Sequence, residues 1–260
     1  MEIVVCVKHV VDTTEVRIDR KTNELILRGI PTKISDYDKH AIEEAVRIKG
    51  KLNATVTLLS IGPKEAVKSL KEGLAMGADK AVLISEKEIE NLEPTKIAYL
   101  LSSAIKKLGN ISLVLCGAVS EDGYNAQVGP AIAEGLNLPH IAYAGEIKVE
   151  SNSVTVDRYL EDRIESLKCE LPVLITVDRR INTPRLPTVI QVMKVSTSKI
   201  VSWNLAGLGF SRDDAVLQDA GTRMLGYRIA SMDRKNIVLE GERSDSIDEL
   251  INHLDNEGVV

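Results

Sequence analysis

Short hydrophobic runs alternate with amphipathic stretches over the first 140 residues. The short runs are typical of buried strands, and the stretches in which apolar residues recur every three or four positions are typical of helices. Strands are expected near residues 3–7, 54–61, 80–84 and 113–116. Helices are expected near residues 36–50, 63–76, 94–108 and 125–136. This alternation predicts an α/β fold, in which a parallel twisted sheet of Rossmann-like type carries helices on both faces.

Other segments follow a different pattern. Residues 15–19 and 24–28 alternate between polar and apolar positions on either side of a polar turn, which predicts a β-hairpin. Residues 140–168 form short, turn-separated alternating segments and predict an antiparallel meander. A last buried strand is expected at 172–177, and a helix from about Thr188, after two prolines.

The last 65 residues show little hydrophobic periodicity, apart from a short helix expected at 244–254. Single apolar residues are spaced through the start of this tail, at Trp203, Leu205, Leu208 and Phe210. A segment with no core of its own does not fold alone. We therefore expect an α/β domain over residues 1–195 and, over 196–260, an extended C-terminal arm that wraps a partner in a tight heterodimer.

The segment 113–129 has the outline of an anion-binding site. A buried strand ends at Gly117, a small polar loop follows, and Asn125 is a good N-cap for the next helix. The first backbone N–H groups of a helix have no intrahelical partner and suit a phosphate. The predicted strands that end at Cys6, Ile61 and Gly117 meet at one edge of the sheet, where open α/β sheets bind ligands. Neither a P-loop nor a Gly-x-Gly-x-x-Gly fingerprint is present, so the pattern fits a nucleotide site and an ordinary strand-to-helix connection alike.

Composition excludes several classes of function. The net charge of −5 gives no support to non-specific nucleic-acid binding, and aromatic residues, at 3%, are too few for base stacking. No apolar run approaches the length of a membrane span, so no direct membrane insertion is expected. The three cysteines are far apart in sequence, which argues against a disulfide framework and a zinc site and favours a cytoplasmic location.

Side chains suited to catalysis are scarce. None of the four histidines pairs by spacing with a nucleophile, and we interpret His9 as a surface or packing residue. Cys6 and Cys116 are expected to be buried, inert thiols. The pairs Asp36/Asp38 and Glu43/Glu44 resemble a helix N-terminus and its solvated face, not a metal site. We therefore expect neither catalytic nor metal-binding residues, and the chemistry is left to ligand binding or a cofactor.

Several motifs, taken together, resemble the β subunit of electron-transfer flavoproteins, up to about Lys194. The N-terminal strand and hairpin at 4–19 resemble that family, as do the helix at 41–49 and the Leu-Ala-Met-Gly-Ala-Asp segment at 74–79. The loop Asp-Gly-Tyr-Asn-Ala-Gln-Val-Gly at 122–129 and the signature between Val156 and Thr176 are similar too. Five positions depart from the family pattern. Four of them, Ser35, Asp36, Tyr124 and Asn125, lie at the expected nucleotide pocket, and the fifth, Arg163, lies in the signature.

The resemblance implies an electron carrier rather than an enzyme. The family pairs this subunit with an α subunit that holds an electron-transferring FAD, and the β subunit binds a second nucleotide. That nucleotide is AMP in most members and a second FAD in a bifurcating branch that takes electrons from NADH. The hairpin at 12–19 looks more like the bifurcating branch, so we expect FAD. By position, the pocket would use Cys6, Ser35, Asp36, Tyr37, Asp38, Ile61, Gly117, Ala118, Val119, Ser120, Glu121, Asp122, Gly123, Tyr124, Asn125, Ala126, Gln127 and Val128.

A second site is implied at residues 185–193, which correspond to the segment with which the family docks on a dehydrogenase or quinone oxidoreductase. Val189 would be the anchor. The docking residues would be Arg185, Thr188, Val189, Ile190 and Met193. The alternative is that Val189, Val192 and Met193 pack inward as an ordinary helix.

Two other classes of protein remain as alternative interpretations of the sequence. An adenine-nucleotide-binding regulator of the universal-stress type would share the sheet and pocket, but it leaves residues 185–260 without a role. An adenylating ligase would need a pyrophosphate loop and a catalytic Lys or Arg, which the sequence does not show.

Overall fold

The structure is a computed structural model that describes residues 1–19, 22, 24–89, 92–211, 213, 214, 217 and 234–259. Its centre is a nine-stranded sheet in the order β11-β10-β9-β12-β8-β1-β6-β7-β13. The strands are β1 (Glu2–Cys6), β6 (Thr55–Ile61), β7 (Lys80–Ile84), β8 (Leu113–Gly117), β9 (His140–Val149), β10 (Ser153–Tyr159), β11 (Ile164–Glu170), β12 (Val173–Val177) and β13 (Ile200–Trp203). The α/β class, with a mostly parallel sheet, is confirmed.

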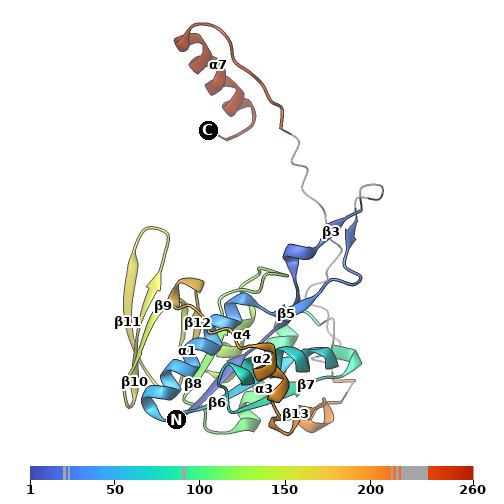
Figure 1. Cartoon of the computed structure of the whole chain (residues 1–260). Coiled ribbons are helices and arrows are strands. Elements are labelled where there is room, and N and C mark those ends of the chain that lie inside the picture. Colours follow the sequence, from blue (N-terminus) through green and yellow to red (C-terminus); the bar gives the residue numbers. More distant parts are fainter. Residues whose placement is uncertain are drawn as a thin grey trace. The chain divides into compact units, whose positions relative to one another are not determined.

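Helices cover both faces of this sheet (Figure 1). They are α1 (Asp36–Leu52), α2 (Val67–Ala75), α3 (Pro94–Leu108), α4 (Val128–Leu136) and α5 (Val189–Lys194). Successive residues of a strand point to opposite faces, so Ile3 and Val5 pack with α1 and α2, whereas Val4 and Cys6 pack with α3 and α4. The strands read as continuous apolar runs because both of their faces are buried.

The first strand lies in the middle of the sheet. β1 pairs in parallel with β6 on one side and with β8 on the other. The chain therefore builds the sheet outward in one direction through β6 and β7, and then returns to the other side of β1 with β8. Such a reversal of strand order leaves a crevice at the carboxyl ends of the strands, where open α/β sheets bind ligands.

The meander differs in part from the expected one. β10 pairs antiparallel with β9 and β11, as predicted. The segments expected at 140–143 and 145–150 form one strand, β9, whose first half pairs in parallel with β12. A register shift and a positive φ of 57° at Tyr143 bend the strand between its two pairings. One strand can thus join the parallel and the antiparallel parts of the sheet.

The start of the expected C-terminal arm belongs to this sheet. β13 adds an edge strand to β7, a pairing that the weak periodicity did not predict. Leu205 is 2% exposed, and Trp203, Leu208 and Phe210 pack against the core on the α3 side. The expectation that these residues lack a core within the chain was therefore wrong. Most of the following segment, 215–233, lies outside the described residues.

Two smaller parts complete the chain. The predicted hairpin is present as β3 (Arg17–Ile18) and β4 (Leu25–Ile26), while two positions of its expected turn, 21 and 23, lie outside the described residues. β2 (His9–Val11) and β5 (Thr32–Ile34) form a second two-stranded sheet at its base. Residues 19–24 and 226–260 group as a separate unit, which contains the predicted C-terminal helix as α7 (Arg243–Asn256).

Candidate nucleotide site

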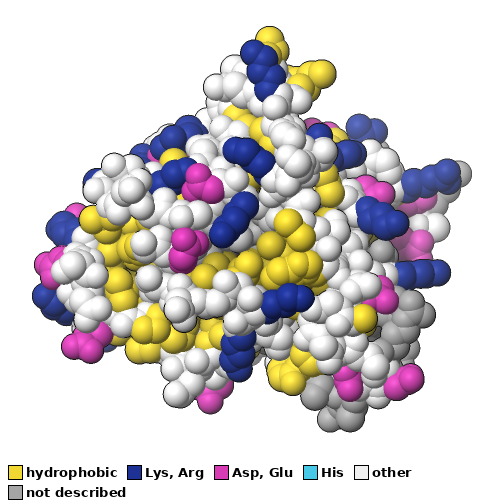
Figure 2. Space-filling model, turned by 90° about the horizontal axis from the view of Figure 1, so that it is seen from below, with side chains coloured by type: hydrophobic (Ala, Val, Ile, Leu, Met, Phe, Trp, Pro, Cys, Tyr) yellow, Lys and Arg dark blue, Asp and Glu magenta, His cyan; other side chains and the backbone are white. Residues whose placement is uncertain are grey.

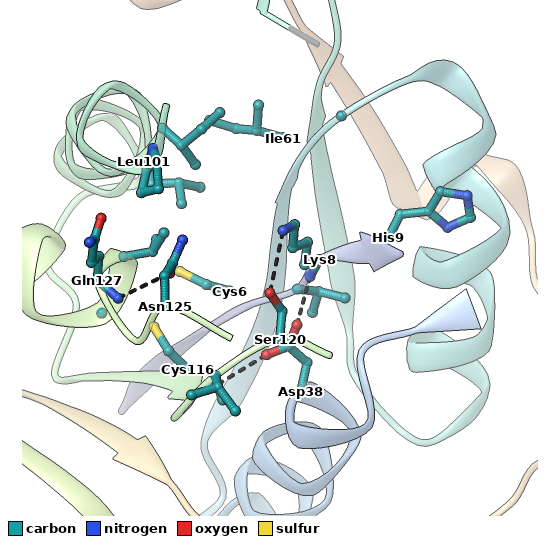
Figure 3. Close-up of a pocket in the computed structure, with 18 of the residues that line it drawn as sticks. Cys6, Lys8, His9, Asp38, Ile61, Leu101, Cys116, Ser120, Asn125 and Gln127 are labelled. Carbon is teal, nitrogen blue, oxygen red and sulfur yellow. Dashed lines mark hydrogen bonds between the residues drawn. The ribbon is translucent and has the colours of Figure 1, made fainter. Parts of the chain in front are cut away.

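A cavity of about 330 Å³ lies at the carboxyl ends of β1, β6 and β8, where the strand order reverses (Figure 3). Twelve of the predicted pocket residues line it: Cys6, Asp38, Ile61, Gly117, Ala118, Val119, Ser120, Asp122, Asn125, Ala126, Gln127 and Val128. The sequence reading did not anticipate Lys8, His9, Leu59, Pro63, Ile97 or Leu101, which line it as well. The cavity therefore has a polar side along the 117–128 loop and an apolar side against α3.

Asp38 ties together two of the strand ends that shape the cavity. Its Oδ2 accepts a hydrogen bond from the Lys8 backbone N–H at 2.7 Å, and its Oδ1 accepts one from the Gly117 N–H at 3.0 Å. Burial raises the pKa of Asp38 to about 7, although both hydrogen bonds act to lower it. Any side chain at position 117 would collide with this carboxylate, because a Cβ there would lie 2.5 Å from Oδ1. The fit explains why a glycine ends β8.

The loop after β8 stays irregular for longer than predicted. α4 begins at Val128, not at Asn125, and the Asn125 Oδ1 instead accepts a hydrogen bond from the Gln127 N–H at 3.2 Å. Tyr124 and Ala126 have positive φ angles of 49° and 54°, which no α-helix contains. Pro130 supplies the physical reason, since proline is tolerated only in the first turn of a helix. The delayed start leaves the N-terminus of α4 at the cavity wall.

Two backbone donors at the end of this loop are available to a ligand. Among the described residues, no protein acceptor bonds the N–H of Ala126 or of Val128. Both residues line the cavity. Free N–H groups at a helix N-terminus suit a phosphate through their geometry and through the helix dipole.

A lysine reaches the same loop from the end of β1. The Lys8 Nζ lies 2.8 Å from the Asp122 carboxylate and 3.3 Å from the Ser120 Oγ, and Figure 3 shows it directed toward Ser120. His9, the next residue, turns to α2 and bonds the Ser69 Oγ through Nδ1 at 2.7 Å. Burial, and then the charge of Lys68, lower the pKa of His9 below its usual value. Sequence reasoning missed Lys8, because a lysine after a strand carries no signal of its own.

Six predicted pocket residues lie outside the cavity lining: Ser35, Asp36, Tyr37, Glu121, Gly123 and Tyr124. Glu121 turns away from the cavity, and its Oε1 accepts a 2.6 Å hydrogen bond from the Asp36 N–H at the start of α1. The hydroxyls of Tyr37 and Tyr124 lie 3.1 Å apart, and the Arg179 guanidinium lies 4.8 Å from the centre of the Tyr37 ring. These residues fix the outer side of the loop to α1.

The wall of the cavity next to the sheet carries two thiols. Cys6 and Cys116 are buried, as predicted, and stand at the ends of neighbouring strands. A hydrogen bond with the Cys6 thiol, and then burial, raise the pKa of the Cys116 thiol well above its usual value. The Cys116 thiol is therefore protonated and poorly nucleophilic at neutral pH. Within the described part of the chain, no group of three metal-ligating side chains comes together.

The acidic pair in the middle of α1 is not a solvated face. Glu43 and Glu44 are buried, which corrects the interpretation drawn from the sequence, whereas Asp36 and Asp38 lie in the first turn of α1, as interpreted. Glu43 accepts hydrogen bonds from Arg185 Nε at 2.7 Å and from Arg47 Nε at 2.8 Å. Burial alone would raise the pKa of Glu43, but these arginines hold it below its usual value.

The hydrogen bonds between Arg185 and Glu43 also position the predicted docking segment. Its Arg185 points inward to Glu43, with the backbone N–H of Arg185 also bonded to the Glu43 Oε2 at 3.1 Å. Thr188 caps α5, and beyond it Val189 is 75% exposed and Met193 76% exposed. The alternative in which Val189, Val192 and Met193 all pack inward is therefore wrong, and Val192 alone of the three is half-buried. Along the described segments of the chain, no helix is long and apolar enough to cross a membrane.

Comparison of the chain with known proteins identifies its family. Residues 22–208 match the electron transfer flavoprotein domain. An electron transfer flavoprotein subunit beta from Thermoanaerobacterium thermosaccharolyticum is 35% identical over 261 residues, covering 100% of both chains. One from Megasphaera elsdenii is 40% identical over 229 residues, covering 85% of this chain and 84% of that one. Subunit CarD of the caffeyl-CoA reductase-Etf complex from Acetobacterium woodii is 36% identical over 225 residues, covering 86% of each. The chain therefore belongs to the electron transfer flavoprotein family, as one of its β subunits, and its role lies in electron transfer.

Proposed function

We propose that the chain forms a heterodimer with an electron transfer flavoprotein α subunit that carries FAD. Together they pass electrons between NADH or a dehydrogenase and an acceptor. The relatives are named as β subunits, and one belongs to a named reductase complex, which supports both a partner subunit and a redox partner. None of these comparisons favours the alternative hypotheses of a universal-stress-type regulator or an adenylating ligase.

The β subunit itself binds a second nucleotide in the cavity. The single observation that carries this proposal is the combination of free N–H groups at the start of α4 with a cavity at the point where the strand order reverses. The adenosine would lie on the apolar side, near Ile61 and Leu101, and the phosphate along the 117–128 loop. The volume of about 330 Å³ is at the lower end of the range of about 300–1,000 Å³ for small-molecule sites.

AMP and FAD share the adenosine phosphate that this cavity fits. We propose FAD, because the N-terminal hairpin resembles the bifurcating branch of the family; AMP is the alternative. A bound FAD would supply a second redox centre, whereas AMP would be structural only.

A second surface serves docking of a redox partner. Its apolar side chains Val189, Ile190 and Met193 are exposed on α5, with Leu186 just before them. Exposed apolar side chains also gather in groups beside Lys and Arg on the face shown in Figure 2. Clustered apolar side chains rimmed by charge are characteristic of protein interfaces.

The C-terminal segment would contact the α subunit. In the separate unit that contains it, α7 exposes Ile247, Leu250 and Ile251, which share one face at helical spacing. A helix with one uncovered apolar face gains stability by packing that face against another surface. Its proposed partner surface is the α subunit.

Counting the nucleotides tests this assignment. The purified heterodimer is denatured, and the released FAD and AMP are measured per pair of subunits. Two FAD and no AMP are expected. One FAD with one AMP would make the protein a plain electron carrier, and a single nucleotide in total would refute the second site.

A further inference from the structure

The cavity contains one Lys or Arg side chain among the described residues that line it, Lys8. Its backbone is fixed, because its N–H donates to the buried Asp38 at 2.7 Å. The Lys8 side chain is 50% exposed, and its ammonium, on a flexible stem, has Asp122 and Ser120 as its partners. An ammonium group on a flexible stem can change partners without movement of the backbone.

The other charges near the loop have fixed partners. Glu121 is turned away to the Asp36 N–H, and Lys33 lies on that same outer side, 3.8 Å from Glu121. The acids that line the cavity are Asp38 and Asp122. Asp38 directs both oxygens to backbone N–H groups, so Asp122 is the acid left to face an incoming phosphate.

A phosphate in the 117–128 loop would meet repulsion from Asp122 and attraction from Lys8. His9 does not contribute a positive charge at neutral pH, since its pKa is lowered and its Nδ1 is bonded to Ser69. The helix N-terminus attracts an anion but does not neutralise a phosphate. Lys8 is therefore the side chain able to offset the phosphate charge, and it is held by Asp122 at 2.8 Å.

We propose that Lys8 and Asp122 form an exchangeable latch at the phosphate end of the cavity. Asp122 neutralises Lys8 in the empty site, and the Lys8 ammonium moves to the nucleotide phosphate when the nucleotide binds. This inference rests on the proposed nucleotide site and adds to it the residue that recognises the phosphate and the residue that competes for it.

The latch predicts that replacing Lys8 and replacing Asp122 have opposite effects on AMP affinity. Lys8→Gln removes a charge-assisted hydrogen bond to phosphate, so AMP affinity falls by about tenfold or more. Asp122→Asn removes the competitor and a like charge, so AMP affinity rises. Adenosine, which has no phosphate, binds both variants as it binds the wild type.

Calorimetric titration of the full-length protein, freed of bound nucleotide, tests this with AMP and adenosine as probes. Lys39→Gln is the matched control, because Lys39 carries the same charge and pairs with Glu72 outside the cavity. The double variant Lys8→Gln/Asp122→Asn should bind AMP no more weakly than Lys8→Gln alone. The dependence of AMP affinity on NaCl should be smaller in Lys8→Gln than in the wild type.

Two results would overturn the latch while leaving the nucleotide site intact. One is an unchanged preference for AMP over adenosine in Lys8→Gln. The other is a loss of AMP affinity in Asp122→Asn with adenosine affinity retained, because the ion pair would then merely shape the phosphate loop. If the wild type binds neither AMP, adenosine nor FAD, the proposed nucleotide site itself fails. Circular dichroism of each variant shows whether it is folded.

Discussion

Replacing Asp38 with asparagine should change how the stability of the protein depends on pH. The Asp38 carboxylate is buried and accepts one backbone hydrogen bond on each oxygen. Burial raises its pKa from 3.8 to about 7. The folded protein therefore binds this proton more tightly than the unfolded chain, so the contribution of Asp38 to stability is greatest at low pH. It declines as the pH rises from about 4 to about 7.

The size of the effect follows from the pKa difference of about three units. At about 1.4 kcal/mol per unit, keeping Asp38 ionised in the fold at pH 8 costs about 4 kcal/mol relative to acid conditions. Asparagine has no charge but offers only one acceptor oxygen, so it loses one hydrogen bond, at about 1–2 kcal/mol. The variant should be about as stable as the wild type at pH 5, where the wild type has already lost a similar amount through ionisation of the unfolded chain. Relative to the wild type, it should gain about 3 kcal/mol between pH 5 and pH 8.

Urea unfolding of the full-length wild type and of Asp38→Asn, at pH values from 5 to 8, measures this difference. Asp79→Asn is the control, because hydrogen bonds from Lys49 and Val56 outweigh burial and lower the pKa of Asp79. Its contribution is present above about pH 4 and stays constant across the measured range. Parallel curves for the wild type and Asp38→Asn would refute the argument. Infrared titration of the buried carboxylic acid band locates the pKa directly.

Two further changes concern the docking segment. Val189→Ala should weaken docking on a redox partner by about 1–2 kcal/mol and leave stability unchanged, because the side chain is 75% exposed. Electron-transfer rates at varied partner concentration measure this, and Ile164→Ala, at a 65% exposed position on β11, should have no effect. Arg185→Ala should lower the free energy of unfolding by about 2 kcal/mol, since it leaves the buried Glu43 with fewer donors. Urea unfolding measures this second change, and an unchanged midpoint would show that the pair contributes nothing.

The core of the fold could be predicted from local pattern alone. Residues such as Val4 and Val5 are buried on opposite faces, so each central strand is apolar throughout and is easily recognised. The alternation with helices then identifies the parallel sheet, and the strand ends identify the cavity. These features depend on the order of apolar and polar residues within short segments, so they can be predicted without knowledge of contacts between distant residues.

The errors arose where distant residues decide the outcome. Glu43 and Glu44 looked solvated because their partners Arg185 and Asn182 lie about 140 residues further along the chain. Lys8 could be assigned to the loop only once β1 and β8 were known to be neighbours. The late start of α4 could have been predicted from a local signal, because Pro130 would lie beyond the first turn of a helix that begins at Asn125.

The position of β13 at the edge of the sheet has a consequence for the order of folding. β7 is synthesised more than a hundred residues before the strand that pairs with its open side. Until then its free N–H and C=O groups form a template on which another chain could add a strand. The nascent protein therefore completes the strands of its nucleotide site while one edge of its sheet is still unprotected. Residues 200–203 cover that side of β7 once they are made, and the new edge is then a strand of only four residues, shorter than β7.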